Sequence, residues 1–120
     1  MTMRYSKNPS NRQLKVSEEI RKQVSQLVLS NDIYHPYLEC VILSINDVRI
    51  SQDLGVATIF FTHSGGDKNN VLEVLNALVP EIRMILGKKM HLRIIPQLRF
   101  IYDETIDNSI RIANILSGSD

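Results

Sequence analysis

The hydrophobic positions near the start of the chain recur every three or four residues. At 3.6 residues per turn this spacing places them on one side of an α-helix. Ser10 and Gln13 stand just ahead of the stripe with the spacing of a capping box, in which each side chain accepts from the other residue's backbone N–H. The pattern therefore predicts a helix over roughly 11–30. Its stripe consists of Val16, Ile20, Val24, Leu27 and Val28.

Two later stretches are rich in apolar and β-branched residues but show no helical stripe, which is typical of strands. The first covers residues 40–50, with Asn46-Asp47 as an expected bulge, and it begins at Cys40, which we expect to be a small core residue. The second covers residues 56–62. Because only a short turn separates them, we expect an antiparallel hairpin. The preceding linker, 31–39, is interpreted as a loop.

The segment after the hairpin predicts helical structure that a proline interrupts. Asp67 is placed to cap a helix, and apolar residues between 71 and 86 keep the helical spacing. Pro80 removes an amide donor and its ring clashes with the preceding turn, so the axis is expected to kink or restart there. Apolar and polar residues alternate over 92–102, which predicts a third strand with Pro96 at an edge or bulge.

The order of elements is therefore α-β-β-α-kink-α-β, which is an α+β chain with a three-stranded sheet. The helices most simply pack on one face of that sheet, leaving the other face open. Residues 1–9 are expected to form a flexible basic arm, 10–116 a single domain and 117–120 a tail. Within the domain, residues 103–116 are expected to add a short last helix.

Composition excludes several classes of protein. The chain has 120 residues, of which 43% are hydrophobic and 22% charged, so wholesale disorder is excluded. Lys and Arg number 14 against 13 Asp and Glu, so a nucleic-acid role requires local clustering of charge. One cysteine excludes a disulfide framework, and no apolar run is long enough to cross a membrane. We expect a small cytoplasmic domain.

Basic residues cluster in two segments that contain no acid. The first runs from 4 to 17 and the second from 83 to 102. Such clusters are typical of a phosphate-binding surface, whose binding weakens with salt as counterions are released. The alternative is a set of solvated faces that only keep the protein soluble. Strand alternation is expected to place Arg93 and Arg99 on one face, with Lys88 and Lys89 at the preceding helix end.

An enzyme is less well supported by the same residues. His35, His63 and His91 have no histidine neighbour at helical spacing, so we predict no metal site and no cofactor. Asp103 and Asp107 stand one helical turn apart, where capping explains them better than a magnesium site. A protein-interaction adaptor without direct RNA contact remains the alternative function. The open strand edge and the loop 34–37 are its candidate docking sites.

Several stretches of the chain resemble the bacterial ribosome-binding factor A family. The resemblance covers about residues 10–116, and its most specific part is the run from Leu86-Gly-Lys-Lys to Asp103. The other matching stretches are residues 12–22, 48–57, 59–61, 75–77 and 82–83.

The resemblance implies a single K-homology-like domain of the second type that is not an enzyme. It further implies binding to the small (30S) ribosomal subunit and its 16S rRNA during late assembly, help with rRNA processing, and importance for growth in the cold. Expected partners are that subunit, ribosomal proteins and an assembly GTPase, and the factor itself is expected to be a monomer without membrane association.

The chain departs from the family at the kink. No Gly-x-x-Gly occurs, and Leu78-Val79-Pro80 stands where the family usually has Ala-x-Gly. Proline offers no amide to a phosphate, so contacts from the side chains of Asn76 and Arg83 are expected instead. The predicted RNA-binding residues are Arg12, Lys15, Lys22, Asn76, Arg83, Lys88, Lys89, Arg93 and Arg99.

Overall fold

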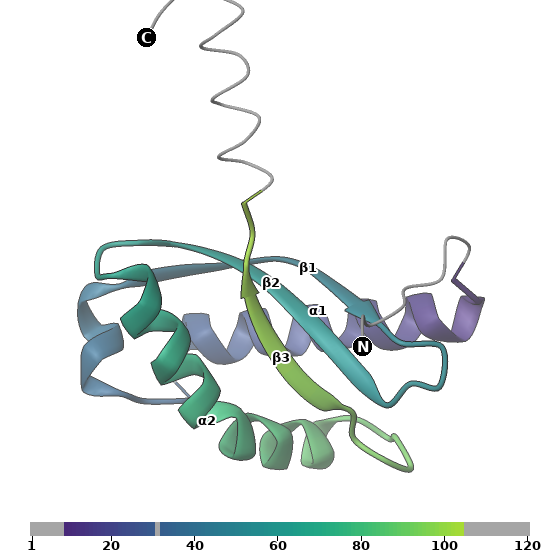
Figure 1. The fold of residues 1–120 in the computed structure, drawn as a ribbon. Coiled ribbons are helices and arrows are strands. Elements are labelled where there is room, and N and C mark those ends of the chain that lie inside the picture. Colours follow the sequence, from purple (N-terminus) through teal and green to yellow (C-terminus); the bar gives the residue numbers. More distant parts are fainter. Residues whose placement is uncertain (1–8, 31, 105–120) are drawn as a thin grey trace, which may run out of the picture.

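A computed structural model describes residues 9–30 and 32–104 of the chain. Two long helices and one three-stranded sheet account for most of this part (Figure 1). In chain order the elements are α1 (Asn11–Ser30), the 3-10 helix η1 (Pro36–Cys40), β1 (Ile42–Ile50), β2 (Val56–Ser64), α2 (Lys68–Lys89) and β3 (Gln97–Tyr102).

The strands lie in the order β1-β2-β3, and the two pairings run in different directions. β1 and β2 form the predicted antiparallel hairpin, with a register shift between Ile45 and Asp47 where a bulge was expected. β3 pairs with β2 in parallel, after the chain has crossed over through α2. The α+β class and the K-homology-like order of elements are thus confirmed.

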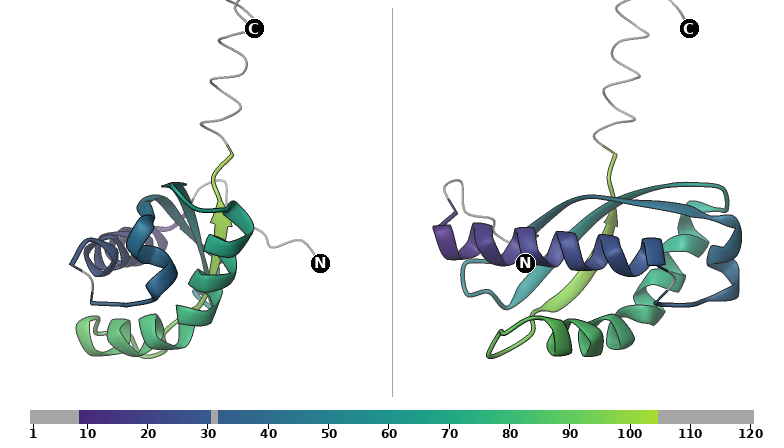
Figure 2. Two further views of the ribbon diagram at one scale, coloured as in Figure 1. Left: turned by 90° about the vertical axis from the view of Figure 1, so that its left-hand side faces the viewer. Right: turned by 180° about the vertical axis from the view of Figure 1, so that it is seen from behind.

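One face of the sheet is buried against the helices. Ala57, Ile59 and Phe61 alternate along β2, are fully buried, and belong to one core cluster with residues of α1, α2 and β3. α1 packs mainly on β1, and α2 packs on β3. In Figure 1 α1 lies behind the strands, and the right-hand view of Figure 2 shows it in front of them. The core therefore lies on one side of the sheet, as predicted.

The start of α1 is fixed by its own capping residues. The backbone N–H of Ser10 donates to Gln13 Oε1 at 2.9 Å, and that of Gln13 donates to Ser10 Oγ at 3.1 Å. Gln13 is buried, and its Nε2 also donates to the carbonyl of Ile50 at 3.3 Å. The predicted capping box thus forms, and it also ties the helix to the end of β1.

The linker before the sheet is more ordered than the sequence indicated. Residues 36–40 form η1, whose first turn is capped by His35, because His35 Nδ1 accepts from the backbone N–H of Tyr37 at 3.1 Å. The prediction that Cys40 lies in the core was wrong. Cys40 ends η1 and is exposed, since the inward alternation of β1 begins only later in the strand.

α2 continues through Pro80 instead of restarting there. Asp67 caps its first turn, with Oδ2 accepting from the N–H groups of Asn69 and Asn70 at 3.0 and 3.2 Å. The helix bends along its length in both Figure 1 and Figure 2. Pro80 has no N–H to donate to the carbonyl of Asn76, and this loss favours a bend. Core contacts on both sides of the proline hold the two halves in one helix.

The third strand is shorter than predicted. It begins at Gln97, after the buried Pro96, so residues 91–96 form a loop. The alternation of residue types in this loop resembles a strand, but Pro96 lacks an N–H for a sheet ladder. The predicted last helix over 103–116, the predicted arm 1–9 and the tail 117–120 lie mainly or wholly outside the described residues.

Candidate RNA interface

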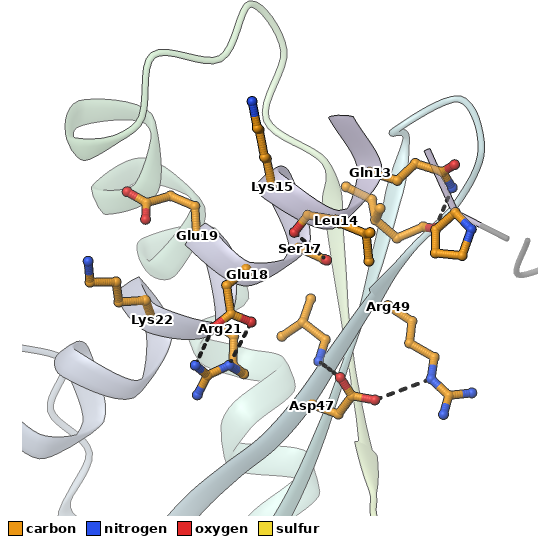
Figure 3. A pocket seen from close by; sticks show the side chains of 13 residues that line it. Gln13, Leu14, Lys15, Ser17, Glu18, Glu19, Arg21, Lys22, Asp47 and Arg49 are labelled. Atoms are coloured by element: carbon orange, nitrogen blue, oxygen red, sulfur yellow. Dashed lines mark hydrogen bonds and ion pairs between the residues drawn. The ribbon is translucent and has the colours of Figure 1, made fainter. Parts of the chain in front are cut away.

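Three of the predicted cations share one flank of α1. Arg12, Lys15 and Lys22 are exposed and stand three and seven residues apart, and Glu19 lies on the same stripe between the two lysines. Figure 3 shows Lys15 and Lys22 pointing away from β1. Because β1 is an edge strand and α2 packs beside α1 over the sheet, this flank is the one on the α2 side.

The other flank of α1 forms an open groove with β1 that carries mixed charge. Glu18 accepts from Arg21, with Arg21 Nε at 3.1 Å from Glu18 Oε2, and Asp47 of β1 faces the same groove (Figure 3). The hydrogen bond from Arg21 lowers the pKa of Glu18 below its ordinary value. Lys15, Glu19 and Lys22 border this groove as well. Because the groove contains acids as well as cations, it is a poorer match for a polyanion than the side toward which the two lysines point.

The end of α2 brings more cations to the same end of the molecule as the start of α1. Lys88 and Lys89 are exposed in its last turn, and Arg93 is exposed in the loop that follows. All three views show α1 and the second half of α2 running side by side (Figures 1 and 2). Within 9–30 and 32–104, none of these cations forms an ion pair. We call this set the helix-side surface: Arg12, Lys15, Lys22, Lys88, Lys89 and Arg93.

Arg83 is engaged by the protein itself. Its Nε donates to the carbonyl of Pro96 at 3.0 Å and its Nη2 to that of Ile95 at 2.9 Å. The guanidinium therefore holds the loop before β3 against α2. Asn76 lies two turns earlier on the same flank and is exposed. Asn76 and Arg83 lie on the flank of α2 that faces β3. They therefore border the helix-side surface and are not counted among its residues.

Arg99 lies on the opposite side of the sheet. Its neighbours Leu98 and Phe100 are buried toward the helices, so strand alternation turns Arg99 outward. The prediction that Arg93 and Arg99 share a strand face was wrong, because Arg93 precedes β3. The nine predicted residues thus occupy the helix side, the outer flank of α2 and the outer face of the sheet.

Two tyrosines of the loop 34–37, a candidate docking site, are engaged by the protein itself. The Tyr37 hydroxyl accepts from the N–H of Asp67 at 2.8 Å, and the Tyr34 hydroxyl donates to Glu39 at 2.9 Å. The bond to Glu39 raises the pKa of Tyr34. Sequence reasoning overlooked an aromatic on the outer face of the sheet, Phe60 of β2, together with Arg49 of β1 beside it. The signal in the sequence that could have revealed Phe60 was the alternation of side chains between the two faces of β2.

Other kinds of site find little support in the described part of the chain. No group of three or more His, Cys, Asp or Glu there is arranged to hold a metal ion. No helix among residues 9–30 and 32–104 is long and apolar enough to span a bilayer.

Comparison with known proteins gives a consistent result. A family model described as ribosome-binding factor A matches residues 12–116. The ribosome-binding factor A of Paracoccus denitrificans (strain Pd 1222) is 39% identical over 110 residues, which cover 91% of this chain and 80% of that protein.

Solved structures agree on the fold. The crystal structure of ribosome-binding factor A from Thermus thermophilus superposes with a TM-score of 0.64 at 17% identity, over 75% of this chain and 94% of that one. A homology model of the Thermus thermophilus factor, fitted into the cryo-EM map of its complex with 30S, gives a TM-score of 0.55 at 18% identity. That match covers 72% of this chain and 93% of the other.

Proposed function

Because the chain belongs to the ribosome-binding factor A family, we propose that it binds the small ribosomal subunit and contacts its 16S rRNA through the helix-side surface. The family name denotes binding and no catalytic activity, in agreement with a protein that is not an enzyme. The complex to which the Thermus thermophilus factor was fitted contains 30S, which supports the same target here. The observation that carries the RNA contact is the shared flank of exposed cations beside the end of α2, none of which forms an ion pair within residues 9–30 and 32–104.

The chemistry of this contact is electrostatic and shape-based. Lysine and arginine side chains hold phosphate oxygens, and such contacts position a protein on RNA without reading bases. Each phosphate contact steepens the dependence of log K on log salt by about 0.7 to 0.9. Six contacts would therefore give a slope of roughly −4 to −5. In this proposal Asn76 orients the bent helix or meets a sugar, and Arg83 adds a contact at the margin of the helix-side surface. Arg99, on the other face of the sheet, would meet RNA separately.

The finer role proposed is assistance in late maturation of the subunit, in the cytoplasm. A factor that binds precursor RNA by shape can favour one fold of that RNA, which helps its processing and matters most when refolding is slow in the cold. Ribosomal proteins and an assembly GTPase are its proposed partners. In a strain lacking the factor we expect precursor rRNA to accumulate at low temperature; mature rRNA at wild-type levels would contradict this role.

The binding experiment compares two double variants of equal charge change. Lys88→Gln with Lys89→Gln removes two cations of the helix-side surface. Arg21→Gln with Lys68→Gln removes two others, which pair with Glu18 and Glu104. Binding to purified small subunits is titrated from about 50 to 200 mM salt. We expect the slope to fall by about 1.4 to 1.8 for the first variant and to stay near the wild-type value for the second.

The same titration separates RNA contact from a protein adaptor. Equal slopes for wild type and both folded variants would remove the helix-side surface as the contact. Binding that persists at high salt would favour an adaptor that contacts ribosomal proteins alone. Complete absence of binding to small subunits would contradict the proposed function itself.

A further inference from the structure

The outer face of the sheet carries a basic and aromatic group of its own. Arg49 of β1 and Arg99 of β3 both pair with Thr58 of β2, so the two arginines end one cross-strand row. The row that follows pairs Phe60 with Ile101 on one side and with Asp47 on the other. Neighbouring strands lie about 4.8 Å apart, so the arginine backbones are separated by roughly 9.6 Å. We call Arg49, Phe60, Arg99 and Ile101 the sheet-side surface.

The side chains of this surface are accessible. Arg49 is 58% exposed, Arg99 is exposed, and Phe60 and Ile101 are partly exposed. Arg49 places its guanidinium carbon 5.5 Å from the centre of the Phe60 ring, and its Nε lies 3.2 Å from Asp47 Oδ2. No ion pair of Arg99 occurs in the described ranges. Thr58, between the two arginines, is fully buried, and Phe60 lies one row along β2 with the Arg49 guanidinium over its ring.

We propose that the sheet-side surface binds single-stranded RNA, as a second contact separate from the helix-side surface. The two arginines would hold phosphates on either side of β2, and Phe60, one row further along the strand, would stack on an adjoining base. Stacking requires an unpaired base, because the base faces of a duplex are covered by their neighbours. This inference rests on the proposed function only in that the target is RNA.

The mixed charge near Arg49 supplies a distinctive test. Asp47 shares the guanidinium of Arg49, so it competes with a phosphate for the same donors. Asp47→Asn removes this competing charge. It keeps a side-chain oxygen for the hydrogen bond that the N–H of Val48 donates to Asp47 Oδ1, at 2.9 Å in the wild-type protein. The variant should therefore bind RNA more tightly than wild type, whereas loss of the folded surface would remove the stacking contact and weaken binding.

The experiment uses the full chain and a fluorescent oligouridine of about 10 nucleotides, which falls in the size range of single-strand sites. Anisotropy titrations are run for wild type, three sheet-side variants and the helix-side double variant Lys88→Gln with Lys89→Gln. Arg49→Gln with Arg99→Gln should weaken binding tenfold or more at about 50 mM salt and reduce the slope by about 1.4. Phe60→Leu should weaken binding about fivefold or more. Asp47→Asn should strengthen it by up to about fivefold.

Three outcomes would overturn the inference. One is oligouridine binding that none of the variants changes. Another is oligouridine binding that falls only with Lys88→Gln and Lys89→Gln, which would place single strands on the helix side. The third is a loss of small-subunit binding in the sheet-side variants with no change for oligouridine, which would indicate a protein neighbour. All three leave the proposed function standing, since that depends on small-subunit binding by the wild-type chain.

Discussion

Arg83 shows how a single side chain can be diverted from the surface to the fold. Its two hydrogen bonds reach consecutive carbonyls of the loop 91–96, which has no sheet partner of its own. A planar guanidinium can serve two acceptors at once, and an ammonium group cannot do so in the same fixed geometry. Arg83 is therefore a residue that positions β3, whatever further contact it makes.

Replacing Arg83 should lower stability. Arg83→Ala leaves two partly buried carbonyls without their donor, and hydrogen bonds from charged groups contribute about 1.5 to 3 kcal/mol each in favourable cases. We expect a loss of roughly 1 to 3 kcal/mol in the free energy of unfolding from urea titration, with partial recovery in Arg83→Lys. The matched control, Lys88→Gln, should stay within about 0.5 kcal/mol of wild type. Unchanged stability in Arg83→Ala would mean that the two bonds are dispensable.

At the scale of single residues, the sequence alone predicted which segments are basic, but not which contacts each basic side chain makes. A run of cations without acids predicted a basic segment, and the exposed Lys88, Lys89 and Arg93 agree with that description. The role of Arg83 depends on two carbonyls more than ten residues away, and no local pattern reports such a contact. Cys40 was misplaced because an apolar neighbourhood in sequence does not fix the residue at which a strand begins.

At the scale of helices and strands, the predictions from short sequence motifs were confirmed wherever the stabilising contacts join residues close together in the chain. The capping box of α1, the bulge of β1 and the cap of α2 each involve residues at most a few positions apart, and each forms as expected. The limits of β3 and the continuity of α2 depend on tertiary packing. Pro80 favours a break, but buried side chains before and after it keep one helix in register with the core.

The cap of α2 can be tested by itself. Asp67→Ala removes the oxygen that accepts from two N–H groups of the first turn, so the free energy of unfolding should fall by about 0.5 to 2 kcal/mol. Asp67→Asn keeps an acceptor in the same place and should lose much less. Chemical denaturation of both variants makes the comparison. Equal losses in the two would show that the charge matters more than the hydrogen bond.

At the scale of the whole molecule, the near-neutral chain separates its cations onto two sides of one sheet. Their separation could not be predicted from the sequence, because it requires knowing which side of β3 faces the helices. The core, in contrast, is a single cluster to which α1, α2 and all three strands contribute. Such a core is expected to unfold in one cooperative transition.

Two core variants test that cooperativity. Ile20→Val in α1 should cost about 0.5 to 1.5 kcal/mol, and Leu98→Ala in β3 about 2 to 5 kcal/mol, because both side chains are buried. In each variant, helical circular dichroism and tyrosine fluorescence should report the same midpoint. Separate midpoints, with one element melting before the rest, would contradict a single core.

The parallel pairing of β3 with β2 has a consequence for how the protein is made. β2 is complete at residue 64, but its second partner is synthesised only after all of α2, at residues 97–102. Until then one side of β2 has no strand beside it, and contacts of this sequence separation form slowly. The nascent chain therefore passes through a stage in which the hairpin and α1 exist without a finished hydrophobic interior. At that stage it is open to association with other unfinished chains or to binding by chaperones.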